Sequence, residues 1–358
     1  DPGEAVPPPA SLVRYYAQQS DGAEIEGVTA VAFGNIQVTF KNGCTINGNT
    51  YNAVWPTDAQ VAFQYAVDIW NSLLLSNAPI LIEAEWCPLD TAYNTTGILG
   101  AAGATTLWVN PGGVCENPAP NTFYSAAQTN LLCEQDILNG NEISAQFNSE
   151  RNNWHFDTTT TPGIGEYDFA SVVLHEIGHG LGFFGSMWSN GTFGFWGYLS
   201  ESGAVYPVIY DRFTETGGGS SLLNFASGST TLHSVLVSDS VYFDGTHANI
   251  ANDGNRVKLY APDPWRQGSS YAHVDTLFDG TPNALMTYSL APREVQHDPG
   301  PITLGMFKDI YMKIETYPVL LDLPAALLVV QNSNNDNLLN LAAYYSDADT
   351  EDVDLNVD

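Results

Sequence analysis

The stretch "HEIGHGLGFFGS", residues 175–186, constrains this chain more than any other feature. It follows the apolar run "FASVVL", so the sequence predicts a buried helix. Residues four apart lie on one face of a helix, and His175 and His179 can therefore direct two imidazoles at one metal ion. The carboxylate of Glu176 would then reach a water on the metal rather than the metal itself. Gly182 suits a sharp turn off the helix, because glycine adopts positive φ without a steric penalty.

These residues resemble the zinc helix of the metzincin metallopeptidases, H-E-x-x-H-x-x-G. The compact members of that clan would place a third histidine at position 185, where this chain has Gly185. A later pair, His273 in "SSYAHVD" and Met286 in "NALMT", is similar to the leishmanolysin family in particular. In that family an inserted segment, here residues 180–272, separates the zinc helix from the third histidine. The resemblance covers roughly residues 28–315, and it implies that His273 is the third ligand and that Met286 forms the methionine turn beneath the metal.

One further residue of the methionine turn extends the resemblance in another direction. Tyr288 stands two positions after Met286. Astacins and serralysins carry a tyrosine there, which can bind zinc at rest and hydrogen-bond the reaction intermediate. Leishmanolysins do not generally carry it, so this sequence mixes features, and a turn tyrosine packed on the core is the alternative.

Other side chains compete for the third ligand position or for a supporting role. Glu201 in "YLSESG" stands near the spacing at which gluzincins supply a glutamate, although its Gly and Ser neighbours show no helical pattern. Asp211 in "IYDRF" is a weaker rival. Asp275 can orient a zinc histidine from outside the ligand set or serve in a turn. His297, before "DPGPITLG", is expected at the entry to a helix.

Periodicity and residue type predict strands and helices in alternation along the first 314 residues. The expected strands cover residues 28–40, 79–86, 105–110 and 141–149. The expected helices cover residues 57–75, 167–183 and 301–314. Between the last two helices, residues 190–270 are rich in Gly and Ser, with short strand-like runs and little helical periodicity.

We therefore expect an α+β fold. The resemblance implies a metzincin-like catalytic domain: a twisted mixed sheet with a backing helix and the zinc helix, then an irregular C-terminal subdomain that ends in a helix. We expect four parts: an N-terminal tether (1–27), an N-terminal catalytic subdomain with the zinc helix (28–186), a C-terminal catalytic subdomain with the third ligand and the methionine turn (187–317), and a short β tail (318–358). The tail resembles the start of a truncated cadherin-like or PKD-like domain.

The charge balance excludes several classes of partner. The chain has 40 Asp and Glu against 10 Lys and Arg, a formal net charge of -30. Such a surface repels phosphate backbones and anionic lipid, so we expect neither nucleic-acid binding nor a membrane-surface role. The acidic residues are spread along the chain, which indicates a solvated surface, with attraction of cationic substrates or Ca²⁺ as the alternative. Calcium is a second candidate cation, although the nearest loop, 346–354, lacks a full ligand pattern.

The cysteines indicate the compartment. Cys44, Cys87, Cys115 and Cys133 have no metal-binding spacing, so we expect two disulfides and a secreted protein. Three pairings are possible, and proximity along the chain favours Cys44–Cys87 and Cys115–Cys133. No apolar run reaches the length of a membrane span. The opening "DPGEAVPPPA" has neither a basic start nor an apolar core, so we expect a mature or trimmed chain without a signal peptide.

The combined expectation is a secreted, monomeric zinc endopeptidase that hydrolyses peptide bonds of proteins with Glu176 as general base. Residues 141–149 would form the edge strand that pairs with an extended peptide substrate, unless that strand lies in the interior of the sheet. A binding or adhesion protein on a metalloprotease scaffold is one alternative, suggested by the tail. A zinc amidase is the other.

Overall fold

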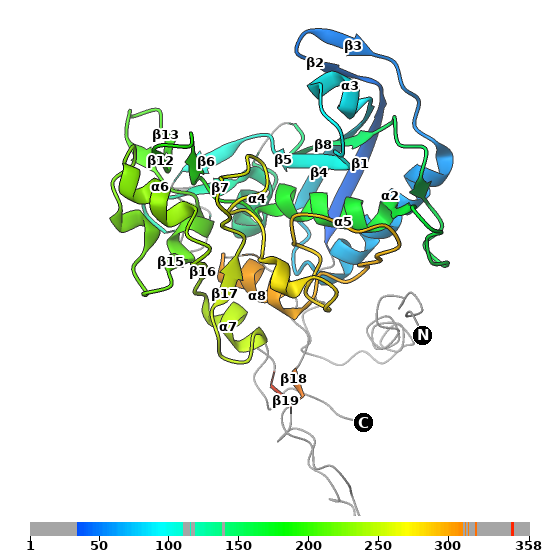
Figure 1. The fold of residues 1–358 in the computed structure, drawn as a ribbon. Coiled ribbons are helices and arrows are strands. Elements are labelled where there is room, and N and C mark those ends of the chain that lie inside the picture. The colour runs from blue at the N-terminus through cyan, green and yellow to red at the C-terminus, as the bar shows by residue number, and fades with distance from the viewer. Residues whose placement is uncertain are drawn as a thin grey trace, which may run out of the picture. The chain divides into compact units, whose positions relative to one another are not determined.

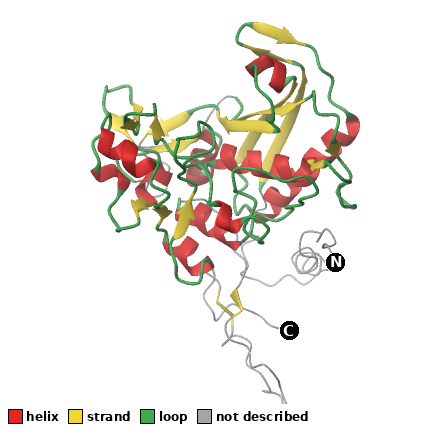
Figure 2. Ribbon diagram, viewed as in Figure 1, coloured by secondary structure: helices red, strands yellow, loops and turns green. Residues whose placement is uncertain are grey.

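The computed structural model describes residues 34–109, 115, 119–137, 140–310, 312 and 314, and the backbone of 319–320 and 345–346. Contacts divide the chain into two units, residues 1–314 and 315–358. The first unit contains every described helix and combines helices with open sheets, so it is an α+β fold (Figures 1 and 2). The expected four-part division, with its subdomain boundary at 186, stays a prediction.

The main sheet has four strands in the order β1-β4-β8-β5. Strands β1 (Asn35–Asn42), β4 (Pro79–Cys87) and β8 (Ile143–Asn148) are parallel, and β5 (Gly100–Ala104) runs antiparallel to β8. The side chains that alternate inward on β4 and β8 are fully buried aliphatic and aromatic groups, which pack against the helices on one face. The sheet is therefore mixed, with its antiparallel strand at one edge.

The expectation that residues 141–149 form the edge strand was wrong. That segment is β8, and it lies between β4 and β5. Ile143, Ala145 and Phe147 on β8 are fully buried, as suits an interior strand. The edge strand next to β8 is β5, whose sequence "GAAGA" consists only of Gly and Ala. Such a strand has none of the β-branched or aromatic residues by which strands are predicted, so it was not expected from the sequence.

Two long helices pack on one face of this sheet (Figure 1). Helix α2 (Thr57–Leu73) contacts β1, and helix α5 (Phe169–Leu181) contacts β5 and β8. The two helices contact each other, and the Trp70 indole donates a hydrogen bond to the Leu174 carbonyl at 3.0 Å. Between sheet and helices, Phe147 forms edge-to-face pairs with Phe63 and Phe169, each worth about 0.5–1.5 kcal/mol beyond simple burial. This core fixes α5 under β5.

Short elements complete the first unit. Those before α5 are β2 (Cys44–Ile46), β3 (Asn49–Tyr51), α3 (Leu89–Tyr93), β6 (Leu107–Val109), β7 (Phe123–Ser125), α4 (Ala126–Cys133), β9 (Trp154–His155) and β10 (Tyr167–Asp168). Those after it are β11 (Trp188–Ser189), β12 (Gly194–Phe195), β13 (Tyr198–Leu199), β14 (Val205–Tyr206), η1 (Ile209–Phe213), β15 (Thr214–Thr216), η2 (Leu222–Asn224), α6 (Thr230–Leu236), β16 (Val241–Phe243), α7 (Thr246–Ala251), β17 (Val257–Leu259), η3 (Thr276–Phe278) and α8 (Pro301–Asp309).

Several of these elements bear on the expectations from the sequence. The predicted strand 105–110 is reduced to β6, and the predicted helix 301–314 is shorter, because α8 ends at Asp309. The Gly-rich and Ser-rich stretch folds into hairpins and short helices, and β12, β13 and α6 gather at one end of the first unit (Figure 1). Disulfides join Cys44 to Cys87 and Cys115 to Cys133, so the favoured pairing is confirmed.

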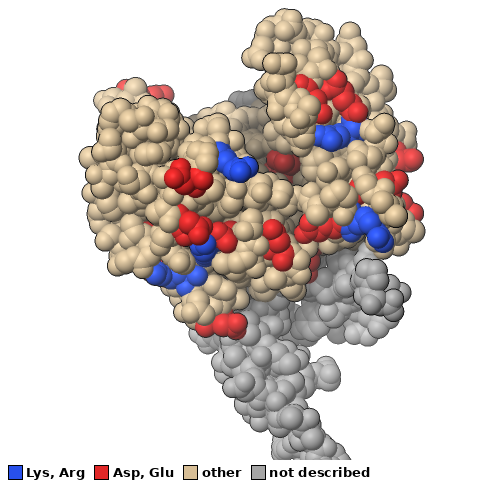
Figure 3. Space-filling view, viewed as in Figure 1, with Lys and Arg blue, Asp and Glu red and all other residues tan. Residues whose placement is uncertain are grey.

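Acidic side chains are scattered over the visible face, with a few Lys and Arg among them (Figure 3). Within the described residues, no helix is both long and apolar enough to cross a membrane. In the second unit, β18 (Val319–Leu320) pairs antiparallel with β19 (Tyr345–Ser346). The predicted tether and the rest of the predicted β tail lie outside the described residues.

Candidate metal centre

Three histidines converge below the edge strand. His175 and His179 lie on α5, and His273 lies in the loop between β17 and η3. The Nε2 atom of His179 is 3.0 Å from that of His175 and 3.1 Å from that of His273, and the remaining pair is 3.3 Å apart. These three side chains form a group that can hold a metal ion. The chain thus brings His273 to α5 across a segment of more than ninety residues (|i−j| = 94 from His179). We call α5 the zinc-type helix, because its residues 175–182 resemble H-E-x-x-H-x-x-G.

The hydrogen bonds of the other ring nitrogens set the tautomers. The Nδ1 atom of His175 is 2.6 Å from the Leu285 carbonyl, that of His179 is 2.7 Å from the Phe183 carbonyl, and that of His273 is 2.8 Å from the Ser269 carbonyl. A carbonyl only accepts, so each Nδ1 carries the proton and each neutral ring keeps a lone pair on Nε2. Three lone pairs that face one another repel unless a cation lies between them. The site therefore fits a metal ion.

The electrostatics keep these rings neutral. Burial lowers the pKa of His175, and burial together with the neighbouring His175 lowers the pKa of His179 to about 3. Burial, aided by the other two histidines, lowers the pKa of His273 well below its ordinary value. A metal ion needs the neutral imidazole as ligand. Because these rings are already neutral, metal binding would not have to displace protons from them.

The methionine predicted to lie beneath the site is close to the zinc-type helix. Met286 is fully buried, and its carbonyl accepts a hydrogen bond from the Val274 amide at 2.9 Å, which joins it to the His273 loop. A Cβ atom at Gly178 would lie 3.0 Å from the Met286 sulfur. Glycine at 178 therefore lets the methionine turn approach the helix between His175 and His179.

Glu176 lies on the cleft side of α5, against the edge strand. A Cβ atom at Gly100 of β5 would lie 3.2 Å from the Cγ atom of Glu176. Burial raises the pKa of Glu176 to about 8, against the opposing effect of a hydrogen bond with the Ala102 backbone. A carboxyl group with a pKa in this range can take and release a proton near neutral pH.

Tyr288 lines the same cleft as β5 and Glu176. Its ring stacks on the ring of Tyr260, with centroids 4.3 Å apart. The cleft has a volume of about 980 Å³, and its lining includes β5 and residues 287–290 after Met286. Its lining contains no Lys, Arg or Asp, and Glu176 is its one acidic side chain. A chain with a net charge of -30 thus has an almost uncharged cleft.

The rival ligands lie elsewhere. Glu201 is exposed in the turn between β13 and β14. Asp211 is buried, and its carboxylate accepts hydrogen bonds from Ser186 and Tyr271 rather than facing the histidines. Asp275 caps η3 and lies 3.3 Å from the Lys258 ammonium. It is therefore not the acceptor of a ligand histidine, since backbone carbonyls fill that role at all three rings.

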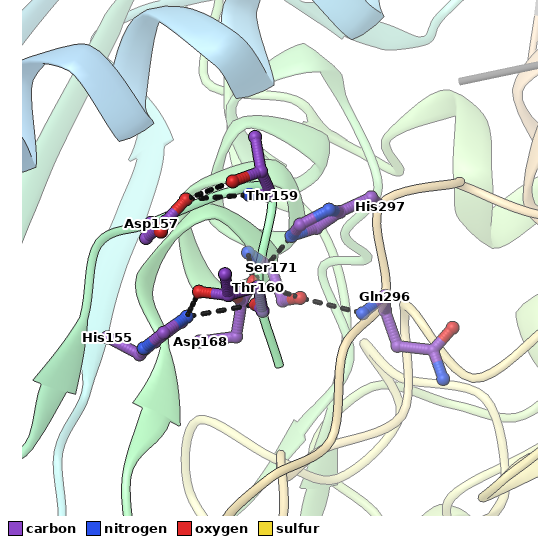
Figure 4. Close-up of polar contacts among 8 residues, drawn as sticks. All are labelled: His155, Asp157, Thr159, Thr160, Asp168, Ser171, Gln296 and His297. Carbon is purple, nitrogen blue, oxygen red and sulfur yellow. Dashed lines mark hydrogen bonds and ion pairs between the residues drawn. The ribbon is translucent and has the colours of Figure 1, made fainter. Parts of the chain in front are cut away.

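A second polar network holds the N-terminus of α5 (Figure 4). Asp168 is the N-cap of the helix, and its Oδ2 atom accepts hydrogen bonds from the amide and hydroxyl of Ser171 at 2.8 and 2.7 Å. The same oxygen is 2.7 Å from the Nε2 atom of His297. The Gln296 amide donates to the Ser171 hydroxyl at 2.7 Å. His155 and Asp157 bond to Thr160 and Thr159 in the neighbouring loop.

His297 was expected at a helix entry, and the role of Asp168 was not predicted from the sequence. The available signal was "DFAS", an aspartate before an apolar run with a serine three positions later, which is an N-cap pattern. Ser171, Asp168 and His297 do not form a catalytic triad, because Asp168 lies between the other two and the serine hydroxyl bonds to Asp168 rather than to a histidine.

Comparison with family models, with curated proteins and with solved structures found no match.

Proposed function

We propose that this protein is a secreted zinc endopeptidase with the catalytic architecture of the metzincins. The observation that carries the proposal is the convergence of three Nε2 lone pairs, from His175, His179 and His273, next to the buried carboxyl group of Glu176. The mixed sheet with an antiparallel edge strand above the helix supports the family resemblance. Met286 under the helix supports it too.

The donor set favours zinc over the other common ions. Calcium and magnesium prefer oxygen ligands, whereas three imidazoles suit zinc. Nitrogen atoms at about 2.0–2.1 Å from a tetrahedral zinc lie roughly 3.3 Å from one another, close to the 3.0–3.3 Å between the Nε2 atoms here. Zinc in such a site supplies Lewis acidity and activates water at neutral pH.

The side chains of the protein would then move the protons and hold the substrate. Glu176 would take a proton from the attacking water and deliver it to the leaving amine, a role that its raised pKa suits. The hydroxyl of Tyr288, which also lines the cleft, would donate a hydrogen bond to the oxyanion. No nucleophilic side chain of the protein forms a bond with the substrate in this scheme.

The shape of the cleft supports a peptide substrate. β5 is the edge strand, and the small side chains of "GAAGA" leave its free edge open to another extended chain. Main-chain hydrogen bonds along such an edge supply affinity that does not depend on the sequence of the substrate. The two disulfides suit an oxidising compartment, which supports secretion.

The test combines metal analysis with hydrolysis. The purified protein should contain about one zinc per chain, should hydrolyse casein and internally quenched peptides, and should lose activity to a chelator and regain it with zinc. Glu176→Gln is the matched control, because it should bind zinc without hydrolysing peptides. A protein that binds zinc but cuts only non-peptide amides would be the amidase. A protein that binds zinc and cuts no amide would be the binding protein, and the endopeptidase proposal would fail in both cases.

A further inference from the structure

Gly185, the position at which a compact metzincin would carry its third histidine, has no room for a side chain. A Cβ atom at Gly185 would lie 2.0 Å from the Cε1 atom of Tyr271 and 2.7 Å from the Oδ1 atom of Asp211. Both distances are too short for any real Cβ contact. Tyr271 stands two residues before His273 in the sequence. Its aromatic ring thus lies directly against the backbone that leaves the zinc-type helix.

Asp211 is a fully buried carboxylate on η1, and it binds three segments together. Its Oδ1 atom accepts hydrogen bonds from the Ser186 amide and the Tyr271 hydroxyl, both at 2.9 Å. Its Oδ2 atom accepts from the Ser186 hydroxyl and from the Val208 amide, the latter at 3.0 Å. Within the described residues Asp211 has no ion pair. Burial raises the pKa of Asp211 against the opposing effect of these hydrogen bonds. Hydrogen bonds rather than an ion pair therefore hold the carboxyl group in place.

Tyr271 is held from several sides. Besides Asp211, its hydroxyl lies 2.8 Å from the Thr214 hydroxyl, and its amide donates to the Tyr260 carbonyl at 2.7 Å. Its φ is +72°, a left-handed conformation that a bulky residue keeps only where its surroundings impose it. The chain that follows turns back, so that the Nδ1 atom of His273 reaches the Ser269 carbonyl. The direction of His273 therefore depends on where Tyr271 is held.

From these contacts we infer that Asp211 and Tyr271 are positioning residues for the third ligand. Asp211 ties the exit of the zinc-type helix, at Ser186, to Tyr271, and Tyr271 in turn directs the Nε2 atom of His273 toward the other two histidines. Asp211 and Tyr271 both belong to the long insertion between His179 and His273, so the insertion itself would align the third ligand. Their side chains occupy the space that a side chain at position 185 would fill. This inference rests on the proposed metal site, and neither residue touches the metal or the substrate.

Three variants test it from different sides. Tyr271→Phe removes the hydroxyl and keeps the ring. Asp211→Asn keeps the shape and replaces one accepting oxygen by an NH2 group, which cannot accept. Gly185→Ala removes no hydrogen-bonding group but presses on the Tyr271 ring. The matched control is Tyr124→Phe, because the Tyr124 hydroxyl is also buried and accepts one backbone hydrogen bond, from the Ala119 amide at 2.7 Å, far from the ligand loop in sequence.

The measurements are the zinc dissociation constant, by competition with a chromophoric chelator, and the visible spectrum of the cobalt-substituted protein. Thermal unfolding of the metal-free form reports whether each variant folds. We expect all three variants, Tyr271→Phe, Asp211→Asn and Gly185→Ala, to weaken zinc binding by about ten- to a hundredfold and to change the cobalt spectrum, with the metal-free protein still folded. Tyr124→Phe should bind zinc and cobalt as the parent does.

Each other outcome overturns the inference in a recognisable way. Variants that bind zinc as tightly as the parent would show that His273 is aligned without them. Variants that lose zinc only together with the metal-free fold would show that Asp211 and Tyr271 serve the fold rather than the ligand. Failure of the parent itself to bind zinc would overturn the proposed function as well, and the two failures are thereby told apart.

Discussion

The Nε2 atom of His297 lies 2.7 Å from the Oδ2 atom of Asp168, although 129 positions separate the two residues. Both side chains are buried. Asp168 caps the helix that carries His175 and His179, and His297 belongs to the segment that follows the methionine turn. This bond therefore joins the N-terminus of α5 to the segment after the methionine turn, beside the hydrogen bond from the Gln296 amide to Ser171.

His297→Ala should lower the free energy of unfolding by about 1–3 kcal/mol, because it removes a donor from a buried carboxylate that keeps its other bonds. His297→Gln, which can still donate, should lose less. Urea unfolding of both variants, compared with the parent, measures the difference. Equal losses for the two variants would show that the ring packs rather than donates.

The raised pKa of Glu176 predicts a pH-dependent effect of its replacement in the metal-free protein. The folded-state pKa of about 8 exceeds the ordinary value of 4.5. The contribution of Glu176 to stability is therefore fully present below about pH 4.5 and is lost as the pH rises through 8. Glu176→Gln does not lose a proton, so its stability relative to the parent should rise by up to about 1.4 kcal/mol per pH unit between pH 5 and 8.

The lowered pKa values of the three histidines act in the other direction. Their contribution to the free energy of unfolding is present above about pH 6.5 and is lost as the pH falls. At low pH the histidines of the unfolded chain bind protons, whereas the buried rings of the folded protein stay neutral. Both proteins carry the same histidines, so the difference between Glu176→Gln and the parent cancels this effect. Urea unfolding at several pH values measures that difference, and a difference independent of pH would contradict the buried, protonated Glu176.

The disulfides predict that the unreduced protein has no free thiol. Ellman titration after unfolding in denaturant should detect none of the four cysteines. After reduction it should detect all four. Two or more free thiols in the unreduced protein would remove the argument for an oxidising compartment.

The sequence predicted the three histidines that lie close together better than the sheet around them. His175, Glu176 and His179 are fixed by the period of one helix, a local property that four residues of sequence display. His273 depends on a chain path of more than ninety residues (|i−j| = 94), and only the family resemblance pointed to it. Local periodicity gives no account of where such a loop returns.

The errors have equally specific causes. The edge strand β5 is built from Gly and Ala, which have low strand propensity, so its position at the edge comes from pairing with β8 rather than from its own residues. Asp211 was considered as a ligand, but its four donors come from segments that meet only in the fold. Asp168 and His297 pair across 129 positions, which no local pattern reveals.

The almost uncharged cleft predicts a preference among substrates. Its lining has no Lys, Arg or Asp, and its one acidic side chain is Glu176, the proposed general base. A charged substrate side chain placed away from Glu176 would therefore lose its hydration without gaining a partner. Peptides that differ only in the residue after the cleaved bond should therefore be hydrolysed faster with Leu or Gln than with Glu or Lys, by about tenfold, the factor that corresponds to roughly 1.4 kcal/mol. The values of kcat/KM for the four peptides measure the preference.

A variant within the cleft makes this prediction sharper. Gln296→Glu places a carboxylate in the lining and should raise cleavage of the Lys peptide relative to the Glu peptide. Ala291→Glu adds the same charge at an exposed position of the same segment, outside the lining, and should leave the ratio unchanged. An equal shift in both variants would mean that long-range charge, not the cleft, sets the preference.

The identity of the third ligand is the prediction on which the site depends. His273→Ala removes one of three converging nitrogen atoms, so zinc affinity should fall by several orders of magnitude and peptidase activity should disappear. Glu201→Ala should change neither, because Glu201 is exposed in a hairpin turn. Equilibrium dialysis and peptide hydrolysis measure the two properties independently. His273 is buried and its Nδ1 bonds the Ser269 carbonyl, so thermal unfolding of metal-free His273→Ala must show that the variant folds. A folded His273→Ala that keeps zinc, beside a Glu201→Ala that loses it, would replace the three-histidine site with a glutamate-containing one and remove the support for the metzincin proposal.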